Sequence, residues 1–298
     1  MTYAPGSTRP VLAAVGARGS AAVLRAAELL AAQRRTSVHV LGVVEPYPLY
    51  GATGEVAVAP PNALEEEITA LAARLELDAQ DALGTRVAWT VDVRCGGVAA
   101  TIVDVGRELA APIIVVGIGR HRAVDRLLGP ETSLEVTRLA DRPVLAVVDT
   151  FTELPTSIVV ATDFSAASAD ALDAALPLVR DPASVTLLHV VERADDPTLH
   201  AEEFACLRRS VVLPPRVAVE EVVAEGPTVP TILDYARGQG ASVIAVGRRG
   251  HPWLDRLLVG SIATALLRAT TCSLLVTPEP IVARTYRQRT AELAASGG

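Results

Sequence analysis

The sequence predicts an α/β protein made of two tandem, Rossmann-like, doubly wound domains, each a five-stranded parallel sheet flanked by helices. Three observations lead to this prediction. The chain repeats itself, strand-sized apolar runs alternate with helical segments in both halves, and several of these runs are apolar almost without interruption. Strands that are apolar on both faces are typical of parallel sheets with helices on both sides.

The internal repeat consists of two blocks that align without gaps. Residues 10–45 align with 157–192 at an offset of 147, and residues 115–148 align with 245–278 at an offset of 130. The second block contains the shared tetrapeptide "DRLL". Two domains fit a chain of 298 residues, because domains usually have roughly 100–200 residues.

The first repeat carries an insertion of 17 residues, the difference between the two offsets. It lies between Glu45 and Gly96 and contains "PYPLYGATGEVAVAPP", whose composition predicts a surface loop. The acidic segment that follows, residues 64–81, is interpreted as an amphipathic helix with a solvated face.

The elements of the second repeat follow from apolar periodicity. The segment after its first strand places Ala167, Ala171, Leu172 and Ala175 on one helical face, with Ser165 or Ser168 as the cap. We expect domain 1 at 1–150, domain 2 at 151–280 and a fraying tail at 281–298. The strands of the second repeat are expected at 157–162, 185–191, 217–223, 242–246 and 273–277.

Composition excludes several classes of function. The net charge of −7 argues against nucleic-acid binding, and no run approaches the roughly 20 apolar residues of a membrane span. Without a recognisable secretory signal, a cytoplasmic location is expected. The chain has no lysine, which excludes a Walker A loop and Schiff-base catalysis. Cys95, Cys206 and Cys272 form neither a disulfide framework nor a metal-binding pair.

A glycine-rich loop in the second repeat has the chemistry of a phosphate site. Gly247 and Gly250 are expected to turn the chain with positive φ after the fourth strand. Gly260 and Ser261 then stand at a helix start, where free N–H groups favour an anion. Arg248 lies in the same loop and is expected to screen phosphate charge.

The spacing Gly247-x2-Gly250-x9-Gly260-Ser261 matches the ATP-binding motif of the universal stress proteins, and "ATDFSAAS" and "LLHVVE" resemble that family's first two strand ends. The resemblance covers both repeats. It implies a protein of stress adaptation that binds ATP or another adenine nucleotide, often with a divalent ion such as Mg²⁺. The site residues it implies are Asp163 and Val190 for adenosine, Gly247, Gly250, Gly260 and Ser261 for phosphates, and Ala161, Thr162, Arg249 and Ile262 along the cleft.

The resemblance also implies how the two repeats associate. In the family the last strand of one unit lies across that of the other, which here concerns residues 143–148 and 273–277. We therefore expect an intramolecular pseudo-dimer, and whole chains that pair further as a homodimer. The sequence identifies no protein partner.

The first repeat departs from the motif. Gly16 stands where Asp163 stands, Arg120 replaces Gly250, and Pro130-Glu131 replaces Gly260-Ser261. A carboxylate at a helix start would repel phosphate, so the first repeat is expected to be free of nucleotide.

No enzymatic chemistry is predicted, because no catalytic constellation or metal cluster stands out and none of the five histidines begins an HxGH motif. His189 is interpreted as a packed histidine within a strand, and Asp163 has a competing interpretation as a simple helix-start residue. Two alternatives to a nucleotide-dependent regulator stay open: an interaction module with both clefts vestigial, and a weak ATPase.

Overall fold

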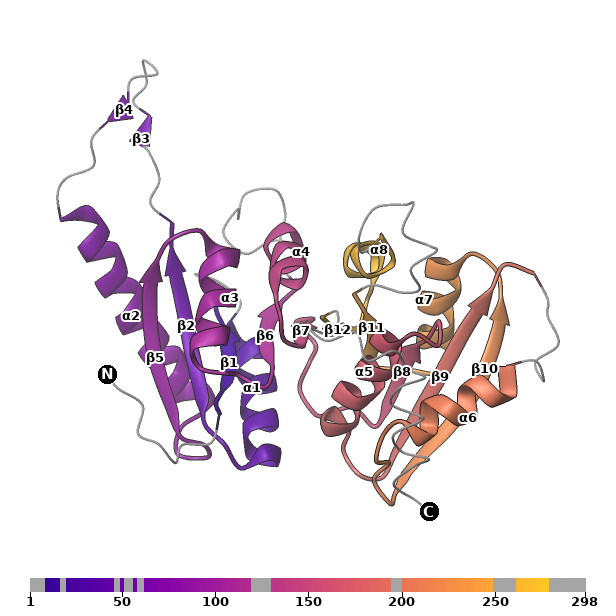
Figure 1. Cartoon of the computed structure of the whole chain (residues 1–298). Coiled ribbons are helices and arrows are strands. Elements are labelled where there is room, and N and C mark those ends of the chain that lie inside the picture. Colours follow the sequence, from indigo (N-terminus) through magenta and orange to yellow (C-terminus); the bar gives the residue numbers. More distant parts are fainter. Residues whose placement is uncertain are drawn as a thin grey trace. The chain divides into compact units, whose positions relative to one another are not determined.

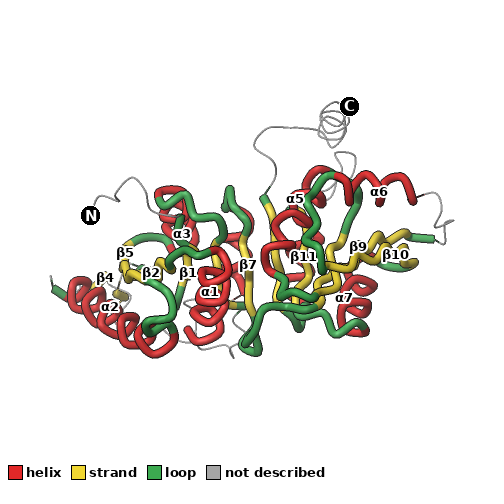
Figure 2. Tube along the Cα trace, turned by 90° about the horizontal axis from the view of Figure 1, so that it is seen from below, coloured by secondary structure: helices red, strands yellow, loops and turns green. Residues whose placement is uncertain are grey.

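Two α/β units, Met1–Leu139 and Ala140–Gly298, make up the chain (Figure 1). In each unit, helices lie on both faces of a central sheet (Figure 2). No helix in the described part of the chain is long and apolar enough to span a bilayer. This computed structural model describes residues 9–16, 20–45, 49–50, 56–57, 62–118, 130–193, 200–248 and 261–278.

The first unit has a parallel sheet of strand order β6-β1-β2-β5. Helices α1 and α2 contact each other, as do α3 and α4. Its strands are β1 (Val11–Ala14), β2 (Val38–Val44), β5 (Trp89–Cys95) and β6 (Ile114–Gly117). Its helices are α1 (Ser20–Arg34), α2 (Ala63–Ala82), α3 (Val98–Glu108) and α4 (Pro130–Leu139).

The insertion of the first repeat contains two short strands where a loop was predicted. β3 (Leu49–Tyr50) and β4 (Val56–Ala57) pair antiparallel, and the remaining residues between 46 and 61 lie outside the described ones. The predicted amphipathic helix is confirmed as α2, which buries Leu75 and Ala79.

The second unit has the strand order β10-β9-β8-β11-β12-β7. The five strands predicted for the second repeat are confirmed, each within two residues of its expected bounds. They are β8 (Ser157–Ala161), β9 (Ala183–Val191), β10 (Val217–Glu225), β11 (Val243–Gly247) and β12 (Ser273–Thr277), all parallel. The helices are α5 (Ala166–Ala175), the short 3₁₀ helix η1 (Leu176–Leu178), α6 (Ala201–Arg209), α7 (Thr228–Gly238) and α8 (Ser261–Ala269).

The last strand of the first repeat, β7 (Val144–Val147), belongs to the second unit. It pairs antiparallel with β12, with Ala146 opposite Leu274 and Val144 opposite Val276. All four residues of β7 are buried. The expected pairing of the two last strands is therefore observed, and β7 covers an edge of β12 that would otherwise be open to aggregation.

Candidate functional site

Five of the sequence-predicted site residues meet at one sheet edge in the second unit. Ala161 ends β8 and is followed directly by Thr162 and Asp163, Val190 lies one residue before the end of β9, and Gly247 ends β11. The carboxyl ends of neighbouring parallel strands form the edge at which doubly wound sheets bind ligands. The order β9-β8-β11 makes these three strand ends neighbours.

Asp163 is placed at the start of α5. Its Oδ1 accepts a hydrogen bond from the backbone N–H of Ser165 at 3.1 Å. Ser165 caps the helix, because its side chain accepts from the backbone N–H of Ser168 at 3.3 Å. A carboxylate is stabilised at this positive end of the helix dipole, so Asp163 has a structural role whether or not it binds a ligand.

Thr162 is buried and supports the same turn. Its hydroxyl donates to Ser168 Oγ at 3.0 Å and accepts from the backbone N–H of Phe164 at 2.9 Å. The next residue, Phe164, has a left-handed backbone with φ of 60°. Its backbone N–H also donates to the carbonyl oxygen of Leu188 at 2.9 Å, so Thr162 has a structural role at this strand end.

Gly247 serves close packing, and the expectation of a positive φ is wrong at this position. It ends strand β11 and is absent from the described glycines with positive φ. A Cβ there would lie 2.6 Å from the Cβ and 2.8 Å from the backbone carbon of Ala167. The glycine is needed because the first turn of α5 lies directly on the strand end. At Gly117, its counterpart in the first repeat, a Cβ would lie 3.5 Å from Val23 Cγ2.

The rest of the glycine-rich loop, including Arg249, Gly250 and Gly260, lies outside the described residues. α8 begins at Ser261, so a helix start falls where the motif expects it, and Ile262 is exposed in its first turn. Arg248, which the sequence predicts to screen phosphate charge, donates from Nη1 to the carbonyl oxygen of Ala140 at 2.6 Å.

Four rings pack together next to Asp163, a cluster that sequence reasoning missed. The ring centroid of Phe164 lies 4.5 Å from that of His189, 5.7 Å from that of His200 and 4.9 Å from that of Phe204. The two histidine rings are 4.7 Å apart. The sequence indicates part of this cluster, because His200 and Phe204 are four residues apart and therefore share a helix face. It does not indicate that Phe164 joins them, since the direction of the Phe164 side chain depends on a left-handed backbone turn.

His189 joins this ring cluster to the strand end. Its Nδ1 lies 2.8 Å from the carbonyl oxygen of Thr162. Because a carbonyl can only accept, Nδ1 carries the proton. Burial lowers the pKa of His189, the nearby His200 lowers it further, and the carbonyl of Thr162 and the carboxylate of Asp163 oppose the shift. The interpretation of His189 as a packed histidine agrees with this half-buried environment.

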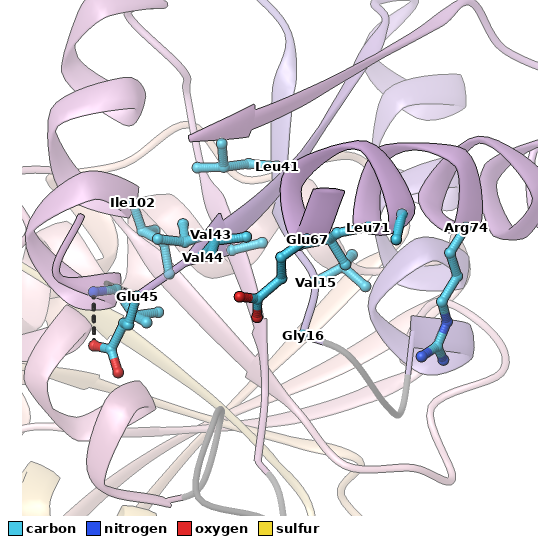
Figure 3. A pocket seen from close by; sticks show the side chains of 13 residues that line it. Val15, Gly16, Leu41, Val43, Val44, Glu45, Glu67, Leu71, Arg74 and Ile102 are labelled. Atoms are coloured by element: carbon cyan, nitrogen blue, oxygen red, sulfur yellow. Dashed lines mark hydrogen bonds between the residues drawn. The ribbon is translucent and has the colours of Figure 1, made fainter. Parts of the chain in front are cut away.

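The first repeat has a pocket of about 250 Å³ at the carboxyl ends of β1 and β2, beside α2 (Figure 3). Gly16 lies at its edge, and Glu45 Oε1 accepts a hydrogen bond from the backbone N–H of Val98 at 3.3 Å. α4 begins at Pro130, as the sequence predicts for a helix start, and Arg120 lies outside the described residues. The pocket is lined by Ala14, Val15, Gly16, Leu41, Val43, Val44, Glu45, Glu67, Ala70, Leu71, Arg74, Val98 and Ile102.

Metal-binding clusters of three or more His, Cys, Asp or Glu side chains are absent from the residues that the structure describes.

The fold is that of a tandem protein with two doubly wound α/β domains, and each domain has a helix start near the carboxyl ends of its strands. The chain belongs to the universal stress protein family, whose model matches residues 7–148 and 156–278. These two matches correspond to the two repeats.

Individual proteins support the assignment. The universal stress protein YxiE of Bacillus subtilis (strain 168) is 30% identical over 142 residues, which cover 40% of this chain and 96% of YxiE. The crystal structure of a universal stress protein from Archaeoglobus fulgidus DSM 4304 has a TM-score of 0.68 at 18% identity, over 91% of this chain and 97% of the other. A structure assigned to the family from Pseudomonas aeruginosa UCBPP-PA14 has a TM-score of 0.59 at 16% identity, over 97% and 98%. At 18% and 16% identity, these two structures show that the fold is shared and nothing further.

Proposed function

We propose that this universal stress protein binds ATP or another adenine nucleotide in its second repeat and acts as a nucleotide-dependent regulator of the stress response. The observation that supports the proposal most directly is the position of Asp163. Its carboxylate follows β8 at the edge where the two neighbouring strands end, β9 one residue after Val190 and β11 at Gly247.

Each group at this edge has a chemical role in the proposal. The carboxylate of Asp163 accepts hydrogen bonds from the nucleoside, and the backbone of Val190 holds the same end. The start of α8 at Ser261 offers backbone N–H groups and a positive dipole end to the phosphates. The glycines at 250 and 260 would let the backbone approach those phosphates, and Mg²⁺ would offset part of the phosphate charge.

Calorimetry with two ligands tests this assignment. Ser261→Ala should weaken ATP by about 10–100-fold, because a hydrogen bond to a charged group contributes roughly 1.5–3 kcal/mol. Adenosine has no phosphate and should bind this variant as it binds the wild type. Asp163→Ala should weaken ATP and adenosine alike. If the wild-type protein shows neither heat nor a melting shift at millimolar ATP, the nucleotide proposal is wrong.

We propose binding rather than catalysis as the function of the site. Release of phosphate from ATP over time, with Asp163→Ala as the control, distinguishes a binding protein from a weak ATPase. Steady release that Asp163→Ala abolishes would favour the ATPase.

A second candidate is an interaction module without nucleotide. The ring cluster of Phe164, His189, His200 and Phe204 favours it, because these rings pack against one another directly beside Asp163. Mass spectrometry of gently purified protein separates the two candidates. Copurified adenine nucleotide supports the first, and its absence together with the null calorimetric result supports the second.

A further inference from the structure

The pocket of the first repeat has the properties of a site for a small molecule. It opens between the carboxyl ends of β1 and β2 and the first half of α2 (Figure 3). Its volume of about 250 Å³ lies just below the roughly 300–1,000 Å³ of pockets for drug-sized ligands. Its occupant would therefore be small.

On the strand side, the histidine of the second repeat has no counterpart in the first. At the offset of 147, Gly42 corresponds to His189. A Cβ at Gly42 would lie 2.7 Å from Leu75 Cδ1 and 3.0 Å from Leu71 Cδ2, so α2 lies close against β2 at this point.

Helix α2 forms the other side of the pocket. Glu67, Ala70, Leu71 and Arg74 line it from successive turns of this helix.

The inner wall of the pocket is apolar. Val15, Leu41 and Val44 are almost fully buried beneath it, and α3 adds Val98 and Ile102. Such a wall favours the aliphatic or aromatic body of a ligand, because burying apolar surface is favourable.

The charged side chains at the rim leave an excess of negative charge. Glu67 points from α2 toward the opening, and Glu45 lies across from it on β2's side (Figure 3). Glu67 has no ion-pair partner within the described residues. Arg74 points away from Glu45 in Figure 3, and its Nε lies 3.9 Å from Oδ2 of Asp78, one helical turn further along. A phosphate would meet two carboxylates here, whereas a cation would be attracted by them.

We propose that the first repeat binds a small organic cation, a protonated amine on an apolar body, whose ammonium donates hydrogen bonds to Glu67 and lies in the field of Glu45. The two repeats would then have different ligand chemistry at equivalent strand ends. This proposal does not depend on nucleotide binding by the second repeat.

The test uses the full chain and three probes that share a phenyl-alkyl body. Calorimetric titration compares 2-phenylethylamine, a cation, with the neutral 2-phenylethanol and the anion 3-phenylpropionate. We expect the amine to bind about 10-fold or more tightly than the alcohol, because a charge-assisted hydrogen bond is added to the same apolar contact, and the anion to bind most weakly. If none of the three binds at millimolar concentration, or if the alcohol or the anion binds best, the proposal is wrong.

Variants on α2 locate the binding. Glu67→Gln should reduce the affinity of the amine to about that of the alcohol and leave the alcohol unchanged. Glu65→Gln removes the same charge from the same helix outside the pocket and is the matched control. Ala70→Phe should fill the pocket and abolish binding of both probes. Amine binding that is unchanged in both Glu67→Gln and Ala70→Phe would overturn the assignment.

The same samples separate this proposal from that for the second repeat. ATP titration of Glu67→Gln should give the wild-type affinity. Loss of ATP binding in Asp163→Ala with normal amine binding would support two independent sites. Wild-type protein that binds ATP but none of the amines would overturn the cation proposal alone.

Discussion

The imidazole of His189 donates a hydrogen bond from Nδ1 to the backbone carbonyl of Thr162, at 2.8 Å. This bond joins β9 to the residue that follows β8, directly before Asp163. Nδ1 donates this bond in both the neutral and the charged ring, so the titrating proton is added at Nε2.

Stability should fall in mild acid because of this histidine. Burial lowers the pKa of His189 in the folded protein below the ordinary 6.5 of the unfolded chain. Below pH 6.5 the unfolded state therefore takes up more protons, and the free energy of unfolding falls until the pH passes the folded pKa, where the loss levels off. The slope stays below about 1.4 kcal/mol per pH unit, since one group takes up at most one proton and a half-exposed ring is screened.

The measurement is urea unfolding between pH 5 and 8, comparing the wild type with His189→Gln. The variant should lose part of the pH dependence. His39 of the first repeat, whose pKa burial also lowers, should account for part of the remainder, and His39→Gln tests this. Equal slopes in the wild type and in His189→Gln would contradict the assignment to His189.

Gly247→Ala and Gly117→Ala should differ in stability although they are equivalent changes. The new Cβ at 247 would lie 2.6 Å from Ala167 Cβ, and overpacking of this kind costs about 1–3 kcal/mol. The new Cβ at 117 would meet Val23 Cγ2 at 3.5 Å, an ordinary contact, and the change should be close to neutral. Thermal melting of both variants checks the prediction, and equal shifts would show that α5 can move away from β11.

Ala110 and Gly240 form a second matched pair. They occupy the same position after α3 and α7, with φ of 47° and 62°. A left-handed backbone is strained for alanine and free for glycine, so Ala110→Gly should stabilise the protein by about 0.5–1 kcal/mol and Gly240→Ala should destabilise it similarly. No atom would lie within 4 Å of a Cβ at Gly240, so the change in stability would come from backbone strain and not from side-chain packing. Melting shifts of the same sign in both variants would contradict this interpretation.

The two repeats should bind ATP unequally, with one ATP per chain. Gly250→Arg copies Arg120 of the first repeat and should abolish binding, because the side chain would fill the cleft. The reverse change, Arg120→Gly, should create no second site, since Gly16 and Pro130-Glu131 remain. Positions 120 and 250 lie outside the described residues, so the prediction depends on the repeat alignment. Two equivalent sites in a titration would count against it.

The strands of the second repeat were predictable because several of them are continuous apolar runs and the repeat presents most elements twice. The bounds of β8 and β12 differ from expectation by at most one residue. The convergence of Asp163, Val190 and Gly247 was predictable for the same reason, since parallel strands end at one edge.

Local geometry at that edge was less predictable. Gly247 belongs to a motif, so its glycine was attributed to a turn, whereas the close approach of Ala167 accounts for it. The hydrogen bond from Arg248 to the carbonyl of Ala140, 108 residues earlier in the chain, was also not foreseen. The contacts of Gly247 and Arg248 join segments that are distant in the sequence. Neither apolar periodicity nor a motif indicates such contacts.

The pairing of β7 with β12 has a consequence for synthesis on the ribosome. Ala146 leaves the ribosome long before its partner Leu274, which lies 128 residues later. At roughly 5–20 residues per second, β7 waits on the order of 10 s for β12. During that time its buried, apolar residues lack their final partner, so the nascent chain passes through a stage at which a chaperone, or a neighbouring nascent chain, competes for the same strand.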